Sequence, residues 1–499
     1  MKRNRLFRTF FSVTGVILLV KLAGFIKQAV TASAFGATIE TDLISLSENF
    51  VGDIQYVLIQ VLLTSFTAVY LHTHGEEEEQ AKRFAMDVIR AFSLIALGLS
   101  AVILLAAPFI ARIIAPGYGP ELSSQLIGYL RLFASALVLF VWTATFHALL
   151  NANRRFIPGE LTGLYQSVII IVFTIFFRKT LGVQTLVLAF FAYHIWNTLY
   201  LGVLSRQYCG RSRGNPFQNK AVRQLLRMAG PLLLGYSMVY INQQVDKALS
   251  SGLEPGTVTA LGYAAVLSNL VGTFIGSFCT ILFTDITAHI VKEDHGGAAK
   301  LASRAVSLLF SIFLPISILT VLCAEDVTSI VFARGAFDAA AVHSAALALQ
   351  GYAFSFVPLV LRDLFSRFQY GYQDTRQPMI NSSLGIAANI VLSITLCPYF
   401  GVFGITFASS VSVLLCGILN TLTARRHNKL LSFRLLGNLL PWLAAGGTLC
   451  ALAAHWCLGQ FPNAVPIVRF SLSTLLGGGA YLLVVTPPLW RLLRRQRIE

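Results

Sequence analysis

Two lysines interrupt an apolar run close to the amino terminus. The segment LLVKLAGFIKQAV, residues 18–30, places Lys21 and Lys27 among side chains that otherwise suit a membrane-spanning helix. A charge at the centre of a bilayer costs roughly 2.5 to 3.5 kcal/mol on insertion scales. Cations kept at such positions are expected to face a polar cavity, where they would bind an anionic group.

The helical period gives these cations a broad polar sector. Gln28 lies seven residues after Lys21 and shares its face, whereas Lys27 lies about 120° away. The next apolar segment carries two acids, Glu48 and Asp53, and either acid could pair with a lysine. Lys27 could also extend its ammonium to the membrane surface. The pattern therefore leaves substrate contact, ion pairing and extension to the surface open.

The composition identifies the element that must position these charges as a membrane-spanning helix. Hydrophobic residues make up 56% of the 499 residues and charged residues 12%, and the mean hydropathy is +0.70. Apolar runs of about 20 residues, long enough to cross a hydrocarbon core of about 30 Å, recur along the whole chain. We predict an all-α polytopic membrane protein with about 14 transmembrane helices. The expected spans are 10–34, 43–71, 85–113, 124–150, 160–178, 183–205, 226–250, 257–290, 301–323, 342–368, 379–397, 401–424, 436–457 and 467–490.

Lysine and arginine are distributed unevenly between the predicted loops. With the amino terminus inside, most of the 38 Lys and Arg residues fall on the cytoplasmic side, as the positive-inside rule requires. Both termini are then cytoplasmic. The formal net charge of +16 follows from this distribution and favours anionic membrane lipids as neighbours. No nucleic-acid partner is predicted, because the charge is spread over many separate segments.

No pattern typical of an enzyme occurs in the chain. The sequence contains no metalloprotease HExxH, no GxSxG nucleophile turn and no phosphate-binding GxxxxGK[ST] loop. We therefore predict that the protein is not an enzyme and holds no cofactor. Any transport would draw on an ion gradient, the membrane potential or the gradient of the transported molecule.

The two halves of the chain resemble each other. The segment that includes Gly117 and Pro158 recurs about 218 to 220 residues later, where Gly335 and Pro378 stand at the corresponding places. Copies of six spans share one orientation, because six is even. This parallel repeat is typical of transporters whose substrate binds between the halves.

The repeat predicts three parts of the chain. We expect a first lobe over residues 1–215, a second lobe over 216–430, and two additional helices with a basic cytoplasmic tail over 431–499.

Several motifs resemble one known family. FARGAFD (332–338), GYQDTRQP (371–378) and KLAGFIKQAVTASAFGATIETDLI (21–44) are similar to motifs of the MurJ (MviN) lipid II flippases, which belong to the multidrug/oligosaccharidyl-lipid/polysaccharide (MOP) exporter superfamily. The layout of six, six and two spans also matches, and the resemblance covers essentially the whole chain.

This resemblance implies a flippase that works by alternating access. It would carry an undecaprenyl-pyrophosphate-linked saccharide, most simply the peptidoglycan precursor lipid II, from the cytoplasmic to the outer leaflet for cell-wall biogenesis. The resemblance places the protein as a multi-pass monomer in the bacterial cytoplasmic (inner) membrane.

The resemblance also implies a substrate-binding cavity lined by charged residues. Lys21 and Lys27 stand where the family has two arginines, and Asp42 stands where it has an aspartate. With Gln28, Glu48 and Asp53, they form the expected substrate-binding set. Two departures matter: ENFVGDIQ (48–55) lacks the family's arginine pair, and Tyr263-Ala264-Ala265-Val266 lacks a further arginine.

A sodium site in the second lobe is implied in the same way. The corresponding residues are Asp246, Asn389, Ser393, Ser409 and, through its carbonyl, Ile405. Oxygen ligands suit a hard cation, although Ser393 replaces an expected carboxylate. Sodium or the membrane potential would then drive transport.

Other functions remain compatible with the sequence. Another exporter of the same superfamily, such as a lipid-linked polysaccharide flippase or a cation-coupled drug antiporter, would share the architecture. Glu48 and Asp53 would suit a cationic drug, whereas Lys21 and Lys27 favour an anion. A membrane scaffold that transports nothing is a third possibility.

Overall fold

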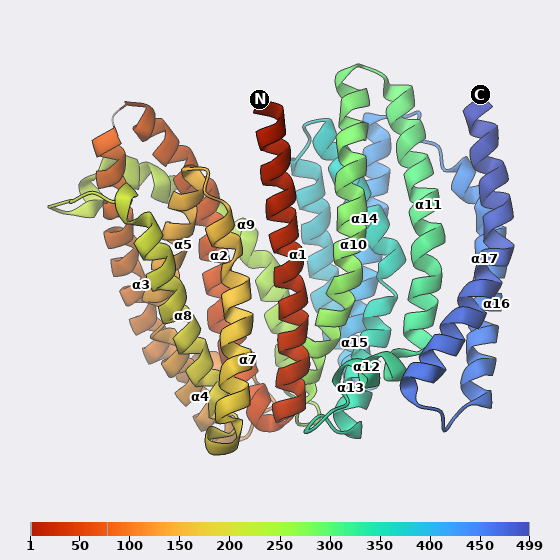
Figure 1. Ribbon diagram of the computed structural model, residues 1–499, viewed down its shortest axis with the longest axis horizontal. Coiled ribbons are helices and arrows are strands. Elements are labelled where there is room, and N and C mark those ends of the chain that lie inside the picture. The colour runs from red at the N-terminus through yellow and green to blue at the C-terminus, as the bar shows by residue number, and fades with distance from the viewer. Residues whose placement is uncertain (1, 77, 499) are drawn as a thin grey trace. The chain divides into compact units, whose positions relative to one another are not determined.

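A computed structural model describes the backbone of residues 2–76 and 78–498. Within these residues the regular elements are helices, as Figure 1 shows. The contacts divide the chain into two units, residues 1–259 with 335–337 and residues 260–334 with 338–499. The prediction of an all-helical membrane fold is confirmed.

The first unit contains nine of the described α-helices and two short 3-10 turns. The helices are α1 (Lys2–Phe35), α2 (Ile39–Glu76), α3 (Glu78–Ile114), α4 (Pro120–Ala134), α5 (Leu137–Ala152), α6 (Ile157–Glu160), α7 (Thr162–Leu181), α8 (Gln184–Ser205) and α9 (Lys220–Ser250). The turns η1 (Arg206–Tyr208) and η2 (Pro216–Gln218) lie between α8 and α9.

The second unit contains the remaining helices, and α10 starts at the end of the first unit. They are α10 (Thr257–Val291), α11 (His295–Leu322), α12 (Ala324–Phe332), α13 (Ala339–Ala353), α14 (Phe356–Gly371), α15 (Arg376–His427), α16 (Arg434–Gln460) and α17 (Pro466–Ile498).

The number of membrane spans is a separate question from the number of helices. Among the described residues, ten helical stretches are long and apolar enough to cross a membrane, or eleven if the bent pair α13–α14 is one span. The 52-residue α15 covers two predicted spans, because Gly401 has non-helical torsions (φ 55°, ψ −137°) in its middle. Helices α1 and α9 coincide with the predicted first and seventh spans but are outside this count. The count of 14 transmembrane helices stays a prediction.

The internal repeat is visible in the backbone. Gly182 ends α7 with φ 55° and ψ −138°, almost the torsions of Gly401, about 219 residues later. Helix breaks also correspond: α4 gives way to α5 at Ser135 and Ala136, and α13 gives way to α14 at Phe354 and Ser355. Glycine suits the positive φ at both joints, since it carries no Cβ.

A serine from a neighbouring helix bonds to the backbone at each of these breaks. Ser100 donates to the carbonyl of Ala134 at 2.9 Å, and Ser317 donates to the carbonyl of Ala353 at 2.6 Å. A broken helix inside a membrane must satisfy its freed polar groups from within the protein. The two units therefore solve the same problem with the same residue type.

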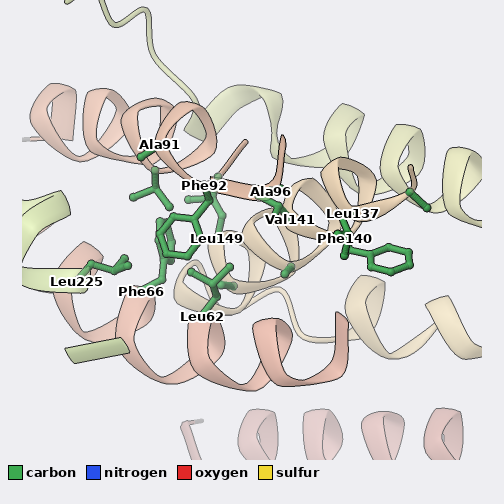
Figure 2. Packing of buried hydrophobic residues seen from close by; sticks show 14 of the residues in the cluster. Leu62, Phe66, Ala91, Phe92, Ala96, Leu137, Phe140, Val141, Leu149 and Leu225 are labelled. Carbon is green, nitrogen blue, oxygen red and sulfur yellow. The ribbon is translucent and has the colours of Figure 1, made fainter. Parts of the chain in front are cut away.

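The core of the first unit joins α2, α3, α5 and α9 (Figure 2). Phe66 stacks on Tyr70 and on Phe84, with ring centroids 5.4 Å apart in each pair. Leu149 and Leu225 complete the cluster from α5 and α9. Because lipid is as apolar as these side chains, close packing rather than exclusion of water stabilises the contact.

Helices α16 and α17 pack against the second unit's repeat. Arg469 on α17 donates through Nε to both carboxylate oxygens of Asp326 on α12, at 2.7 and 2.9 Å. Gly477 lies so close to α16 that a Cβ there would come within 2.9 Å of the Cys450 carbonyl. The last two helices are thus fixed to the second unit by a buried ion pair and by close backbone approach.

The two units are defined by contacts in the structure, whereas the predicted lobes are defined by the sequence repeat. Helix α9 packs against α2 and α3 and so belongs to the first unit by contacts, whereas the sequence repeat assigns it to the second lobe. The predicted lobe boundaries stay a prediction.

Candidate functional site

A charged cluster lies where α2 packs against α9. Lys247 Nζ is 3.9 Å from Asp53 Oδ2, and the two side chains are 16% and 18% exposed. Gln244 Nε2 donates to the same carboxylate oxygen at 2.7 Å. The amide and the ammonium together compensate a carboxylate that the membrane interior would otherwise disfavour.

Helix α1 adds a second cation to this cluster. Lys27 and Glu48 are both half-buried and interact electrostatically, and Glu48 also interacts with Lys247. The order Lys27, Glu48, Lys247, Asp53 therefore alternates positive and negative charge across α1, α2 and α9. We call these four residues the charge cluster.

The charge cluster decides which acid meets which lysine. Asp53 pairs with Lys247, and Glu48 interacts with Lys27 and Lys247. The sequence left pairing and substrate contact open; the structure shows an ion pair between Asp53 and Lys247, and substrate contact stays a prediction. A bound anion would have to replace the carboxylates as the partner of the lysines.

The other two residues of the predicted α1 set lie apart from these contacts. Lys21 is exposed, with Leu22 and Ile26 exposed beside it, and Gln28 is half-buried. Within the described residues of this unit, neither side chain takes part in a hydrogen bond or an ion pair. Their role in substrate binding stays a prediction.

Asp42 has partners that explain its position. Its carboxylate accepts the backbone N–H of Gly256 at 2.7 Å and that of Thr259 at 2.7 Å, and the side chain is 2% exposed. Both donors lie at the amino-terminal end of α10, where N–H groups have no partner within the helix. Asp42 thereby holds the start of α10 to the start of α2.

Sequence reasoning missed Lys247 and Gln244 as members of the site. Lys247 directly follows Asp246 in the chain. Adjacent helical residues do not face each other, so Lys247 is free to turn toward α2 and Asp53. That spacing rule was the signal in the sequence that could have identified it.

Four of the five residues of the expected sodium site meet within α15. Ser393 donates to Asn389 Oδ1 at 2.9 Å, and Asn389 Nδ2 donates to Ser409 Oγ at 2.9 Å. Ser409 in turn donates to the Ile405 carbonyl at 3.4 Å. Neutral oxygens of this kind fit a hard monovalent cation. The carboxylate of the set, Asp246, belongs to the other unit.

The repeated helical bundles, the broken helices closed by serines and the charge cluster define a multi-pass membrane transporter of the two-repeat type. The family model of the lipid II flippase MurJ matches residues 31–492. The chain belongs to that family, whose members are transporters and not enzymes.

Individual proteins agree with the family model. The chain is 25% identical over 502 residues to a probable lipid II flippase MurJ of Rhizobium tropici, with 96% of this chain and 90% of that protein covered. A solved structure of the lipid II flippase MurJ in an inward closed conformation matches with a TM-score of 0.82 at 17% identity, covering 98% of this chain and 100% of that one. An inward-facing MATE family multidrug transporter of the MOP superfamily matches with a TM-score of 0.68 at 15% identity, covering 83% and 98%. These two structural likenesses establish the fold.

Proposed function

We propose that this protein moves lipid II from the cytoplasmic to the outer leaflet by alternating access. The observation that carries the proposal is the family match, which runs over residues 31–492. The charge cluster supports it, because an undecaprenyl-pyrophosphate headgroup is anionic and needs cationic partners inside a membrane.

The proposed binding step is an exchange of partners. Lys247 is paired with Asp53, and Lys27 interacts electrostatically with Glu48, so each lysine has an opposite charge nearby. When the pyrophosphate enters, its oxygens would take over the two ammonium groups. Lys27 and Lys247 would then bind the headgroup in place of the arginines that the family's motifs carry and this chain lacks.

The proposal includes the place of the protein and its neighbours. We infer a monomer in the cytoplasmic membrane with both termini in the cytoplasm, in keeping with the positive-inside distribution of Lys and Arg. Its partners would be the lipid-linked saccharide and membrane lipids. Nucleic acid has no part in this proposal.

Sodium is proposed as a coupling ion together with the membrane potential. Asn389, Ser393, Ser409 and the Ile405 carbonyl would supply neutral oxygens, and Asp246 would supply the charge. The chain of hydrogen bonds that now joins the four residues would be broken where the ion is held.

Lysine substitutions test the proposal. Lys21→Ala and Lys27→Ala should each abolish complementation of a flippase-depleted strain, and Lys247→Ala should do the same because it removes the second ammonium of the charge cluster. Lys27→Arg should keep growth, since it keeps the charge. Lys179→Ala, at an exposed position in the last turn of α7, is the matched control, and each variant is checked for its amount in the membrane.

Full growth with both Lys21→Ala and Lys27→Ala would overturn the cationic cavity. Native mass spectrometry of the purified protein adds a direct measurement. A co-purified undecaprenyl-pyrophosphate species supports the flippase, an organic cation supports a drug antiporter, and a protein that neither retains nor moves lipid-linked sugar is a scaffold.

A further inference from the structure

A fixed corner at the end of α5 holds an arginine in place. The N–H of Arg154 bonds to the carbonyl of Asn151 at 2.9 Å, and that of Arg155 bonds to the carbonyl of Leu150 at 2.8 Å. Arg154 has φ 58°, the left-handed conformation that this helix-ending pattern requires. These two hydrogen bonds therefore fix the backbone conformation that leads into Arg155.

Arg155 lies beside the end of α8 at a shallow cavity that is open to the surface. This open cavity has a volume of about 550 Å³ and is lined by Arg155, Val203, Leu204, Arg206 and Gln207. No carboxylate among the described residues lies within ion-pair distance of Arg155 or Arg206. Two guanidinium groups thus share a space that offers them no protein anion.

An apolar stripe on α8 leads to this cavity. Trp196, Leu199 and Val203 are 51%, 61% and 74% exposed, and their spacing of three and four residues places them on one face. Val203 also belongs to the cavity wall. The stripe is long and exposed enough to face lipid chains.

Aromatic rings mark the level of the membrane surface beside the stripe. Tyr165 on α7 contacts Trp196 and Tyr200 edge to face, with centroids 6.3 and 5.0 Å apart. Tyrosine and tryptophan gather where hydrocarbon meets the headgroups. Arg206 follows Tyr200 by less than two turns, so the cavity lies at headgroup depth.

The second unit closes the corresponding corner with its own acid. Gln373 has φ 62°, and Asp374 follows it as Arg155 follows Arg154. Asp374 Oδ2 lies 2.9 Å from His427 Nε2, and His427 stands about 220 residues after Gln207. The Gln377 N–H, with His427, holds the pKa of the Asp374 carboxyl below its ordinary value, so the acid that closes this corner is ionised.

We propose that the corner formed by Arg155 and Arg206 binds the phosphate headgroup of an anionic membrane lipid, whose acyl chain lies along Trp196, Leu199 and Val203. In the second unit the corner contains the carboxylate of Asp374. In the first unit it contains the two cations Arg155 and Arg206, and the anion would be a lipid of the bilayer. The guanidinium groups would donate to the phosphate oxygens, which Arg binds in a planar, two-pronged geometry. The site is separate from the charge cluster and does not depend on which substrate the protein moves.

The test measures lipid retained by the full-length protein in native mass spectrometry. Phosphatidylglycerol and phosphatidylcholine are offered at equal concentrations to the wild type and to Arg155→Gln/Arg206→Gln. We expect the wild type to prefer phosphatidylglycerol and the double variant to lose about tenfold of that preference. Arg154→Gln is the matched control, because it removes the same charge one residue away and Gln373 shows that Gln accepts this backbone conformation.

A second variant keeps both arginines. Gln207→Glu puts a carboxylate into the cavity, as Asp374 does for the other unit, and should lower phosphatidylglycerol binding as far as the double variant does. Equal phosphatidylglycerol binding by the wild type, the double variant and Gln207→Glu overturns the proposal. Binding of inorganic phosphate as tight as that of phosphatidylglycerol also overturns it, because the free anion would then suffice without the apolar stripe.

Discussion

Asp42 shows how the partners of one residue can give it a structural role beside a predicted functional one. Its two oxygens accept two backbone N–H groups at the start of α10, and Thr41 beside it contacts Thr259 through their hydroxyls at 3.2 Å. A carboxylate near a helix amino terminus is favoured by the unpaired N–H groups there. The resemblance placed this residue in the cavity, and that role remains a prediction.

Substitution of Asp42 separates the two roles. Asp42→Ala leaves two buried N–H groups without an acceptor, which should destabilise the protein by about 3 kcal/mol. Reversible unfolding in detergent measures the loss, and Asp42→Asn should lose less because one oxygen remains. Unchanged stability of Asp42→Ala, together with lost binding of lipid-linked substrate, would contradict the structural role and favour the cavity.

The charge cluster shows that the role of a lysine also depends on the partners that the fold gives it. A lysine inside an apolar helix indicates a functional residue. Its positive charge alone does not determine which acidic residue it contacts. Lys247 forms its ion pair with Asp53, which is far away in the chain. Direction around the helix decided this pairing.

At the level of helices, the serines at the breaks explain how a bent span is tolerated in lipid. Ser100 and Ser317 lie on α3 and α11 and bond to the last carbonyl of α4 and of α13. Without these hydroxyls each carbonyl would lose this hydrogen-bond donor. The two units therefore share this contact at the break as well as the position of the break.

Removal of either hydroxyl should destabilise its own unit. Ser100→Ala and Ser317→Ala are each expected to lower the free energy of unfolding by about 1 kcal/mol, since hydrogen bonds between membrane helices have this size. Titration with a denaturing detergent provides the measurement. Ser277→Ala is the control, because the Ser277 hydroxyl is exposed and bonds only to Thr273 of its own helix. A loss equal to that of the control would show that the breaks do not need the hydroxyl.

For the whole molecule, the charge of the proposed cargo predicts a response to voltage. A pyrophosphate headgroup carries about two negative charges, and each is worth roughly 2.3 kcal/mol per 100 mV of potential. In proteoliposomes with an imposed potassium diffusion potential, outward movement should speed up when the cytoplasmic side is negative and slow down when the potential is reversed. Exchange of external and internal Na⁺ for choline tests the ion separately.

The two arms of that experiment have distinct meanings. Rates that follow voltage but ignore Na⁺ would contradict the site of Asn389, Ser393, Ser409 and Ile405 while leaving the flippase in place. Rates that ignore voltage would contradict net movement of negative charge, and would require a counter-ion that travels with the headgroup.

The class of fold and the repeat could be predicted from the sequence because they depend on sums and periods. Mean hydropathy, the length of apolar runs and the spacing between similar segments are properties of the chain as written. Thus the predicted joint between spans at 397–401 falls where Gly401 breaks α15. The family resemblance was readable for the same reason, since its motifs are local.

Only the tertiary structure decided which side chains contact each other. Asp53 and Gln244 are 191 residues apart in the chain, and Asp42 and Thr259 are 217 apart. Hydropathy and periodicity describe the faces of one helix, and they carry no information on which other helix a face will meet. The pairing of Asp53 with Lys247, the anchoring of α10 by Asp42 and the acid-free corner at Arg155 therefore followed from packing, because each depends on the contact between helices that are distant in the chain.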